Sequence, residues 1–442
     1  MPAKLDRRNF LRLSGTLSLG TLLVACAPAP APTTEGAQGE PSATGETVEL
    51  SLMMVDYAEP TKAVLEDEII PAFTREKNVT VNVNYTDWGR YNEQMTTAFA
   101  SGVTPDVFQG GAVWAPQMAK RGWALPLDDY IALAGDEWNW DDFFPALQDD
   151  VTIDGSIVAV PYRIDIRSFW YRQDHMEEAG IAAPPTNWEE LREFANALTI
   201  RENGKITREG YHFSGPGGWQ NDLQAYMQFM EMAGGQFLSD DLTHCTLDEP
   251  PAIEALEYVY TLVVEDQVQP YPGFEAQGDL APIAVGMASS TYDSSFLERD
   301  VNLYAPDQLE HLVVTLPLRH KVQACHVWVN KFFISSLTKT PDMAWAFFQH
   351  LTSAPMLEKY CASAGVTPPR RSLADAEFMT DRMKVLLTAT EYAVPYPKHW
   401  RLIELFRPLA TNLEKCLRGE LSPEETMVAT CAEIDAILAE DA

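Results

Sequence analysis

Strand and helix patterns alternate along the first part of the folded region, and this alternation limits the fold more than any other feature of the chain. Residues 48–55 have the pattern of a strand, apolar side chains recur at helical spacing over 61–77, and residues 79–85 alternate apolar and polar side chains. A second helix over 91–101 and a third strand over 105–109 follow. Strands that alternate with crossover helices form a mostly parallel sheet, so the pattern predicts an α/β fold.

Later parts of the chain mix short strands with helix starts. Two strands are predicted over 157–162 and 167–171, with a polar interruption between them. Thr186 and Glu189 have the spacing of a capping box at a helix start, and Ser422–Glu425 repeats that spacing with proline at the first helical position. The C-terminal region is therefore predicted to be helical.

The N-terminus has the layout of an export signal. Basic residues precede an apolar run over 13–25, which is shorter than the roughly 18 to 20 residues that a membrane-spanning helix needs. The letters LVAC, ending at Cys26, are similar to a bacterial lipobox, and Arg7 and Arg8 stand in a segment similar to a twin-arginine signal. We expect Cys26 to carry a lipid. The alternative is a buried thiol at the end of the signal.

Residues 27–47 contain no large apolar side chain and cannot bury enough surface to offset the entropy of ordering. They are predicted to form a flexible tether after residues 1–26, which hold the export signal and the lipidation cysteine. A lipid anchor at Cys26 would place the protein on the outer face of the cytoplasmic membrane, on the periplasmic or extracellular side. The sequence leaves open whether export uses the twin-arginine or the general route.

The net charge of the chain makes some classes of binding partner unfavourable. The chain carries 64 acidic residues against 32 basic residues, which gives a formal net charge of −32. Phosphate backbones and anionic membrane surfaces repel such a protein, so nucleic acid is not an expected partner. With 46% apolar residues, the region beyond the tether can form two or three domains with buried cores.

Five cysteines follow Cys26, and none of them forms a CxxC pair, so no metal site is predicted. Cys416 and Cys431 flank a turn between two expected helices. Two alternatives remain for them, a disulfide or two buried thiols.

Motifs that carry catalysis by their spacing are missing from the sequence, which has no GxSxG, HExxH or GxxxxGK[ST] segment. Pairs of carboxylates that could hydrolyse a glycoside occur by chance among 64 acids, so they do not separate an enzyme from a binding protein. We expect a protein that is not an enzyme and holds no cofactor.

Five segments, taken in order, resemble the extracellular solute-binding proteins of bacterial ABC importers, in particular the sugar-binding type that includes the maltose-binding proteins. The first reads ASGVTPDVF and the second VAVPY, and a long segment with the letters PPTNWEEL follows them. The segments are Ala100–Phe108, Val158–Tyr162, Phe169–Leu191, Ala284–Met287 and Gly365–Arg370. The resemblance covers almost all of the chain after the tether.

The resemblance implies a two-lobed periplasmic-binding-protein-like fold of type II, with the lobes joined by a multi-strand hinge and the ligand cleft between them. Lobe 1 is expected over 48–163 and 314–352, and lobe 2 over 164–313 and 353–442.

The resemblance also implies a function. A monomeric substrate-binding lipoprotein would capture a mono- or oligosaccharide by hinge closure and deliver it to an ABC permease in the membrane. Two alternatives stay open at this point. The same fold could bind a polyamine or another small solute, or the chain could be a carbohydrate-active enzyme.

Candidate ligand-binding residues follow from the chemistry of sugars. Ligands of open α/β sheets lie beyond the carboxyl ends of strands. A sugar there requires flat aromatic faces for its C–H surfaces and planar polar groups for its hydroxyls. The candidates after the first three strands are Asp56, Tyr57, Trp88, Gln109, Gly111 and Trp114.

Further candidates come from the resemblance. Asp165 takes the position of a sugar-binding glutamate at the hinge, and Tyr292 stands near a stacking tryptophan that this chain lacks. Arg163 could instead pair between the lobes, and Arg370 could instead brace its proline-rich loop. The remaining candidates are Trp219, Asn221, Asp293 and Trp328.

Overall fold

The computed structural model describes residues 48–55, 58–215 and 219–441, except for the side chains of residues 219–221 and 441. No helix within these ranges is long and apolar enough to cross a membrane.

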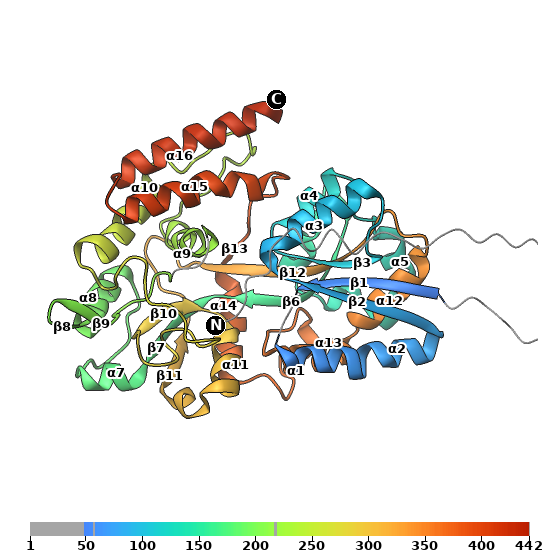
Figure 1. Ribbon diagram of the computed structural model, residues 1–442, viewed down its shortest axis with the longest axis horizontal. Coiled ribbons are helices and arrows are strands. Elements are labelled where there is room, and N and C mark those ends of the chain that lie inside the picture. Colours follow the sequence, from blue (N-terminus) through green and yellow to red (C-terminus); the bar gives the residue numbers. More distant parts are fainter. Residues whose placement is uncertain (1–47, 56–57, 216–218, 442) are drawn as a thin grey trace, which may run out of the picture. The chain divides into compact units, whose positions relative to one another are not determined.

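The first lobe is built on a mixed sheet with helices above and below it (Figure 1). The strands of this sheet are β1 (Val48–Val55), β2 (Val79–Thr86), β3 (Val107–Gly110), β12 (Cys325–Ile334) and β13 (Ala393–Val394), in the order β13-β12-β3-β1-β2. β13 pairs with Cys325 and His326, at the end of β12 that lies in lobe 2. β1 is parallel to both β2 and β3, as the alternating pattern predicts, whereas β12 is antiparallel to β3.

Helices α3 and α4 cover one face of this sheet, and α1, α2 and α13 cover the other (Figure 1). The apolar core on the α1, α2 and α13 face includes Leu52, Phe73 and Phe348. The core on the α3 and α4 face includes Met95 and Met118. The helices and short elements of this lobe are α1 (Glu59–Ala63), the π-helical turn η2 (Val64–Ile69), α2 (Ile70–Lys77), α3 (Trp88–Ser101), α4 (Trp114–Lys120), α5 (Asp128–Trp138), η3 (Trp140–Asp142), α6 (Pro145–Asp150), β4 (Thr152–Ile153), β5 (Ser156–Ile157), α12 (Pro341–Leu351), α13 (Ala354–Ala364) and η6 (Arg371–Leu373).

Capping residues set the two ends of helix α3, which begins with Trp88. The Asp87 side chain accepts a hydrogen bond from the Arg90 backbone N–H at 3.1 Å, so α3 begins at Trp88 rather than at the predicted residue 91. The helix ends at Gly102, whose φ of 72° is a left-handed conformation that glycine adopts without strain.

The second lobe contains a small antiparallel sheet in the order β10-β7-β11, surrounded by helices. Its elements are β7 (Ser168–Arg172), α7 (Gln173–Glu178), α8 (Trp188–Leu198), β8 (Ile200–Glu202), β9 (Lys205–Arg208), α9 (Trp219–Met232), α10 (Pro250–Tyr260), the π-helical turn η4 (Thr261–Glu265), β10 (Ser290–Asp293), α11 (Ser295–Tyr304), η5 (Pro306–His311), β11 (Leu312–Thr315), α14 (Asp381–Ala389), η7 (Thr390–Tyr392), α15 (Leu402–Leu417), α16 (Pro423–Leu438) and η8 (Ala439–Asp441).

The two predicted capping boxes have different outcomes. At α16 the box is confirmed, because the Ser422 hydroxyl accepts from the Glu425 N–H and the Glu425 carboxylate accepts from the Ser422 N–H. At α8 the cap is Asn187, one residue later than predicted, and Glu190 accepts from the Thr186 N–H at 2.8 Å. The shift occurs because the Asn187 amide oxygen reaches the Glu190 N–H at 3.0 Å.

Strands β6 (Val160–Ile166) and β12 pass from one lobe to the other and form the hinge (Figure 1). At one end, Val160 and Phe332 belong to the core of lobe 1, and at the other end Ile166 and Cys325 pack with residues of lobe 2. A third crossing segment contains Thr367, which bridges to Ile164 through an N–H···O bond of 3.1 Å. The predicted two-lobed fold with a multi-strand hinge is confirmed.

Two of the expected lobe boundaries differ from the packing. Leu318 and Ala324 lie in the core of lobe 2, so the chain returns to lobe 1 only along β12 rather than at residue 314. Leu357 and Tyr360 of α13 lie in the core of lobe 1, so the later crossing comes after residue 353. Both differences arise from packing. The apolar side chains of Leu318 and Ala324 are buried in lobe 2, and those of α13 are buried in lobe 1.

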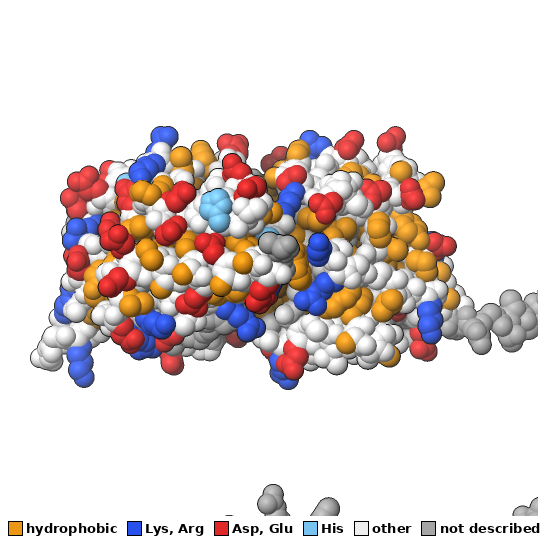
Figure 2. Space-filling view, turned by 90° about the horizontal axis from the view of Figure 1, so that it is seen from above, with side chains coloured by type: hydrophobic (Ala, Val, Ile, Leu, Met, Phe, Trp, Pro, Cys, Tyr) orange, Lys and Arg blue, Asp and Glu red, His pale blue; other side chains and the backbone are white. Residues whose placement is uncertain are grey.

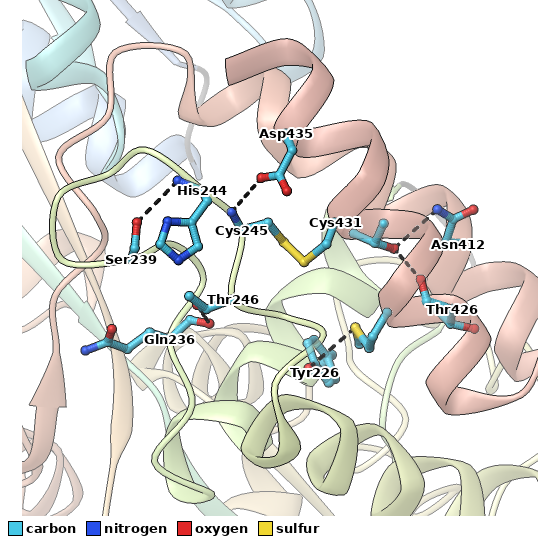
Figure 3. Close-up of a disulfide and its surroundings, with 12 residues drawn as sticks. Tyr226, Gln236, Ser239, His244, Cys245, Thr246, Asn412, Thr426, Cys431 and Asp435 are labelled. Carbon is cyan, nitrogen blue, oxygen red and sulfur yellow. Dashed lines mark hydrogen bonds between the residues drawn. A yellow bond between two sulfur atoms is a disulfide. The ribbon is translucent and has the colours of Figure 1, made fainter. Parts of the chain in front are cut away.

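A disulfide joins Cys245 to Cys431, with the two Cα atoms 5.1 Å apart (Figure 3). The suggested pairing of Cys416 with Cys431 is therefore wrong, and Cys416 is a buried thiol. The loop that carries Cys245 lies against α16, where the Cys245 N–H donates to the Asp435 carboxylate at 2.8 Å.

Removal of this disulfide is expected to destabilise lobe 2. The bond closes a loop of 186 residues, and losing it enlarges the unfolded ensemble. The double variant Cys245→Ser, Cys431→Ser should lose about 2–5 kcal/mol of unfolding free energy in urea titrations. Reductant should destabilise the wild type by a similar amount and leave the double variant unchanged. A wild type whose unfolding free energy does not change with reductant would contradict the assignment of this disulfide.

Candidate functional site

A cleft of about 810 Å³ lies between the lobes and takes residues from both lobes and from the hinge. Its volume is typical of small-molecule sites. The residues that line it include Lys62, Trp88, Asn92, Gly111, Trp114, Arg163, Asp165, Arg167, Gln224, Phe296, Arg299, Trp328, Asn330 and Arg407.

The floor of the cleft is made by alternate residues of the two hinge strands. In the antiparallel pair of β6 and β12, Asp165 lies opposite Trp328, and Arg163 lies opposite Asn330. Successive side chains of a strand point to opposite faces, so these four residues share one face. Ile164 and Val329, on the other face, are buried in an apolar cluster. The hinge strands are thus polar toward the cleft and apolar behind it.

Several polar atoms of the floor are buried but make no hydrogen bond with any described residue. They are Oδ1 of Asp165, Nε1 of Trp328 and Nε of Arg167. A buried polar group without a partner costs about 1–3 kcal/mol, and a ligand hydroxyl can supply the missing bond. The floor therefore offers acceptor and donor atoms to a polar ligand.

Aromatic rings form the wall on the lobe 1 side. Trp88 is 36% exposed at the start of α3, and its ring centroid lies 5.7 Å from that of Tyr91. Tyr91 in turn packs edge-on against Trp114 at 5.0 Å. A Cβ atom at Gly111 would lie 3.6 Å from the Trp88 ring, so glycine leaves the space beside this ring open.

On the opposite side, the ring of Phe296 from α11 faces the hinge. The guanidinium of Arg163, which is only 3% exposed, lies 4.9 Å from the centre of this ring. Arg163 therefore makes a cation–π contact from the hinge floor to Phe296 of lobe 2.

Two of the cationic side chains that line the cleft are paired with neighbouring acids. Lys62 pairs with Glu59 at 2.9 Å, and Arg299 pairs with Asp300 at 2.7 Å. Burial raises the pKa of the Asp300 carboxyl, an effect that Arg299 opposes. Figure 2 shows Lys and Arg side chains at the boundary between the lobes, in contrast to the acidic side chains spread over lobe 2.

Two predicted site residues are placed away from the cleft. The amide of Gln109 is fully buried and accepts a hydrogen bond from the Val55 N–H at 3.0 Å, so it joins β3 to β1. The guanidinium of Arg370 donates to the Thr352 and Asn139 carbonyl oxygens at 2.9 and 3.0 Å. It braces lobe 1, which is the alternative that the sequence left open.

Tyr292 and Asp293 line a second cavity of about 220 Å³ rather than the cleft itself. This cavity, called the side pocket, is bounded by β10, α9 and residues 212–215. The Tyr292 hydroxyl accepts a hydrogen bond from the Leu318 N–H at 2.9 Å, so its oxygen already has a partner. Burial raises the pKa of Asp293, against the effect of nearby Arg167.

The structure brings six of the predicted residues to the cleft, namely Trp88, Gly111, Trp114, Arg163, Asp165 and Trp328. Asp56, Tyr57, Cys26 and the side chains of Trp219 and Asn221 lie outside the described residues. Sequence reasoning missed Asn330 and Arg167, although their spacing of two residues from Trp328 and Asp165 was a usable signal.

Comparisons with known proteins agree with this architecture. A family model described as bacterial extracellular solute-binding protein matches residues 57–357. A protein of Brucella abortus (strain 2308), named as a binding protein, is 23% identical over 406 residues, which is 90% of this chain and 95% of the relative.

Solved structures of solute-binding proteins share the fold. A Thermotoga lettingae protein bound with alpha-D-tagatose superposes with a TM-score of 0.79 at 22% identity, covering 89% of this chain and 100% of the other. A maltose-bound T. maritima protein gives a TM-score of 0.77 at 20% identity, covering 88% and 100%. The match of the family model over most of the chain, on a two-lobed fold with a polar and aromatic cleft, shows that this chain belongs to the bacterial extracellular solute-binding proteins.

Proposed function

We propose that the protein captures a neutral carbohydrate in the cleft by hinge closure and delivers it to an ABC permease. The observation that carries this proposal is the hinge floor, where buried polar atoms of Asp165, Trp328 and Arg167 have no described partner. They lie beside aromatic rings, and carbohydrates present hydroxyls and C–H faces together. Tagatose and maltose bound to the two solved relatives support the same class of ligand.

Closure follows from the position of the floor between the lobes. A ligand held only by the floor and one wall gains the contacts of the other wall when the lobes approach. A shift from 1:99 to 99:1 in favour of the closed form requires about 5.5 kcal/mol of differential affinity. Two or three additional hydrogen bonds to charged groups, at about 1.5–3 kcal/mol each, are of this size.

Attachment to the membrane is a further part of the proposal and rests on the sequence alone. The lipobox-like letters before Cys26 support lipidation and export. Mass spectrometry of the mature N-terminal peptide tests it. An unmodified Cys26 in the exported protein would refute the anchor without affecting the proposed ligand.

A thermal-shift screen tests the ligand class. Neutral mono- and disaccharides and polyols should include at least one compound that raises the unfolding midpoint with a saturating dependence on concentration. The same compound should make the protein more compact in small-angle scattering and should be recovered chemically unchanged. A polyamine that raises the midpoint while no carbohydrate does would overturn the proposal, and cleaved oligosaccharide would favour an enzyme.

A further inference from the structure

The side pocket adjoins the cleft on the lobe 2 side. Arg167 and Gln224 line both cavities, so the two spaces meet at these side chains. The side pocket measures about 220 Å³, room for roughly seven water molecules at ~30 Å³ each. A ligand in the cleft can therefore extend one end into it.

The walls of the side pocket carry polar groups of two kinds. Some are already engaged: the Gln228 amide bonds to the His326 N–H at 3.0 Å and to the Ala324 carbonyl at 2.8 Å, and the Thr291 hydroxyl donates to the His212 carbonyl at 2.9 Å. These groups shape the pocket and leave little capacity for a ligand.

Four other groups of the side pocket keep hydrogen-bonding atoms that no described residue uses. Nε of Arg167 is buried without a partner among the described residues. The Gln224 amide, Nε2 of His212 and Oδ2 of Asp293 also make no hydrogen bond with that part of the chain, since Asp293 accepts from the Ser294 N–H through Oδ1 only. Donors and acceptors thus converge on one small space.

A buried carboxylate fixes the orientation of the His212 ring. Its Nδ1 lies 2.6 Å from Oε2 of Glu209, a residue with 0% exposure. The other carboxylate oxygen of Glu209 accepts from the Phe274 N–H at 2.7 Å. With Nδ1 bound to a fixed carboxylate, Nε2 remains available to a ligand. This buried pair orients the imidazole as a positioned hydrogen-bonding group.

The kind of ligand group follows from charge and from ring geometry. Arg167 and Asp293 line the pocket with opposite charges and interact electrostatically, so a neutral ligand group is favoured. The ring edges and faces of Tyr292 are packed against Phe169 and Phe229, at 5.8 and 6.3 Å between centroids. The pocket therefore offers hydrogen bonds rather than a stacking platform.

We propose that the side pocket is a second ligand subsite, which receives a hydroxyl-bearing terminal carbon of the carbohydrate held in the cleft. The subsite rests on the proposed function, and it adds a preference: ligands with a hydroxymethyl end beyond the part bound in the cleft bind more tightly than analogues without it.

Matched ligand pairs test the subsite by calorimetry. The pairs are glucose with xylose, and maltose with its xylose-terminated analogue, each differing by one hydroxymethyl group. For the pair that binds, the wild type should prefer the longer member by about tenfold, the value of one or two hydrogen bonds. Equal affinity for both members of that pair would overturn the subsite.

Two variants locate the preference in the side pocket. His212→Phe removes a hydrogen-bonding group that lines only the side pocket, and Ala225→Leu reduces the volume of that pocket. Each should weaken the longer ligand to the level of the shorter one and change the shorter one less than twofold. The control Asn92→Ala, in the cleft wall of lobe 1, should affect both members alike.

The outcomes separate the two proposals. If no carbohydrate binds the wild type, the proposed function fails. If a carbohydrate binds and both variants keep the wild-type preference, the subsite fails while the proposed function stands. Should either variant fail to fold, the affinities of the wild type for galactose and for 6-deoxygalactose test the subsite instead. If the subsite exists, loss of the terminal hydroxyl alone must weaken binding.

Discussion

Replacement of Asp165 by alanine is expected to weaken carbohydrate binding by roughly 10- to 150-fold. Hydrogen bonds to a charged group contribute about 1.5–3 kcal/mol, and each 1.4 kcal/mol is a factor of ten in affinity. Asp165 lies on the hinge floor opposite Trp328, and its Oδ1 is buried without a described partner. In the ligand-free protein the carboxylate therefore has hydrogen-bonding capacity that only a ligand or water can use.

The same substitution should leave the ligand-free protein as stable as the wild type, or more stable. Removing a buried oxygen that lacks a partner removes a desolvation cost. Calorimetry measures the affinity, and urea titration measures the unfolding free energy of the ligand-free form. Asp136→Ala is the matched control, because it removes one acid from the exposed surface of α5. An affinity for Asp165→Ala within twofold of the wild type would contradict the assigned role.

Replacement of Arg370 by alanine is expected to have the opposite profile, a loss of about 3–5 kcal/mol in unfolding free energy with little change in affinity. The Arg370 side chain is 1% exposed and lies 4.1 Å from the ring centre of Phe143. Its guanidinium also pairs with Asp142 at 3.3 Å. Without it, two backbone carbonyl oxygens inside lobe 1 lose the Arg370 donor, and the Asp142 carboxylate keeps only its hydrogen bonds to Ser372.

The neighbouring Arg371 offers a matched control, because its side chain is exposed and Arg371→Ala should change stability by less than about 1 kcal/mol. Urea midpoints of both variants and calorimetry on their folded forms provide the measurements. If Arg370→Ala keeps its stability but loses affinity, Arg370 belongs to the ligand site after all.

These two residues show how far a sequence reading of the site extends. Asp165 was identified at the hinge, and alternation along β6 and β12 is enough to place Arg163, Asp165 and Trp328 on one face. Arg370 was an equally plausible planar group in the sequence. Its partners, at Asn139, Asp142 and Thr352, lie far along the chain, so only the packing shows that its hydrogen bonds are used inside lobe 1.

Tyr292 illustrates a related limit. Its position near the expected stacking residue suggested a ring facing the ligand. In the structure the ring packs among Phe169 and Phe229, and the hydroxyl accepts from the Leu318 N–H. Whether a ring face is open depends on neighbours from other segments, which a single sequence does not specify.

By itself, the sequence determined the α/β order of strands and helices, the membership in the family, and the capping box that begins α16. These features depend on side-chain periodicity and on hydrogen bonds within a few residues, so they can be read locally. The tertiary structure alone decided the pairing of Cys245 with Cys431, the packing of α13 in lobe 1 and the side pocket behind Arg167. Each of these depends on which of several chemically similar groups come into contact across a long stretch of chain, and that choice is made by the packing of the whole core.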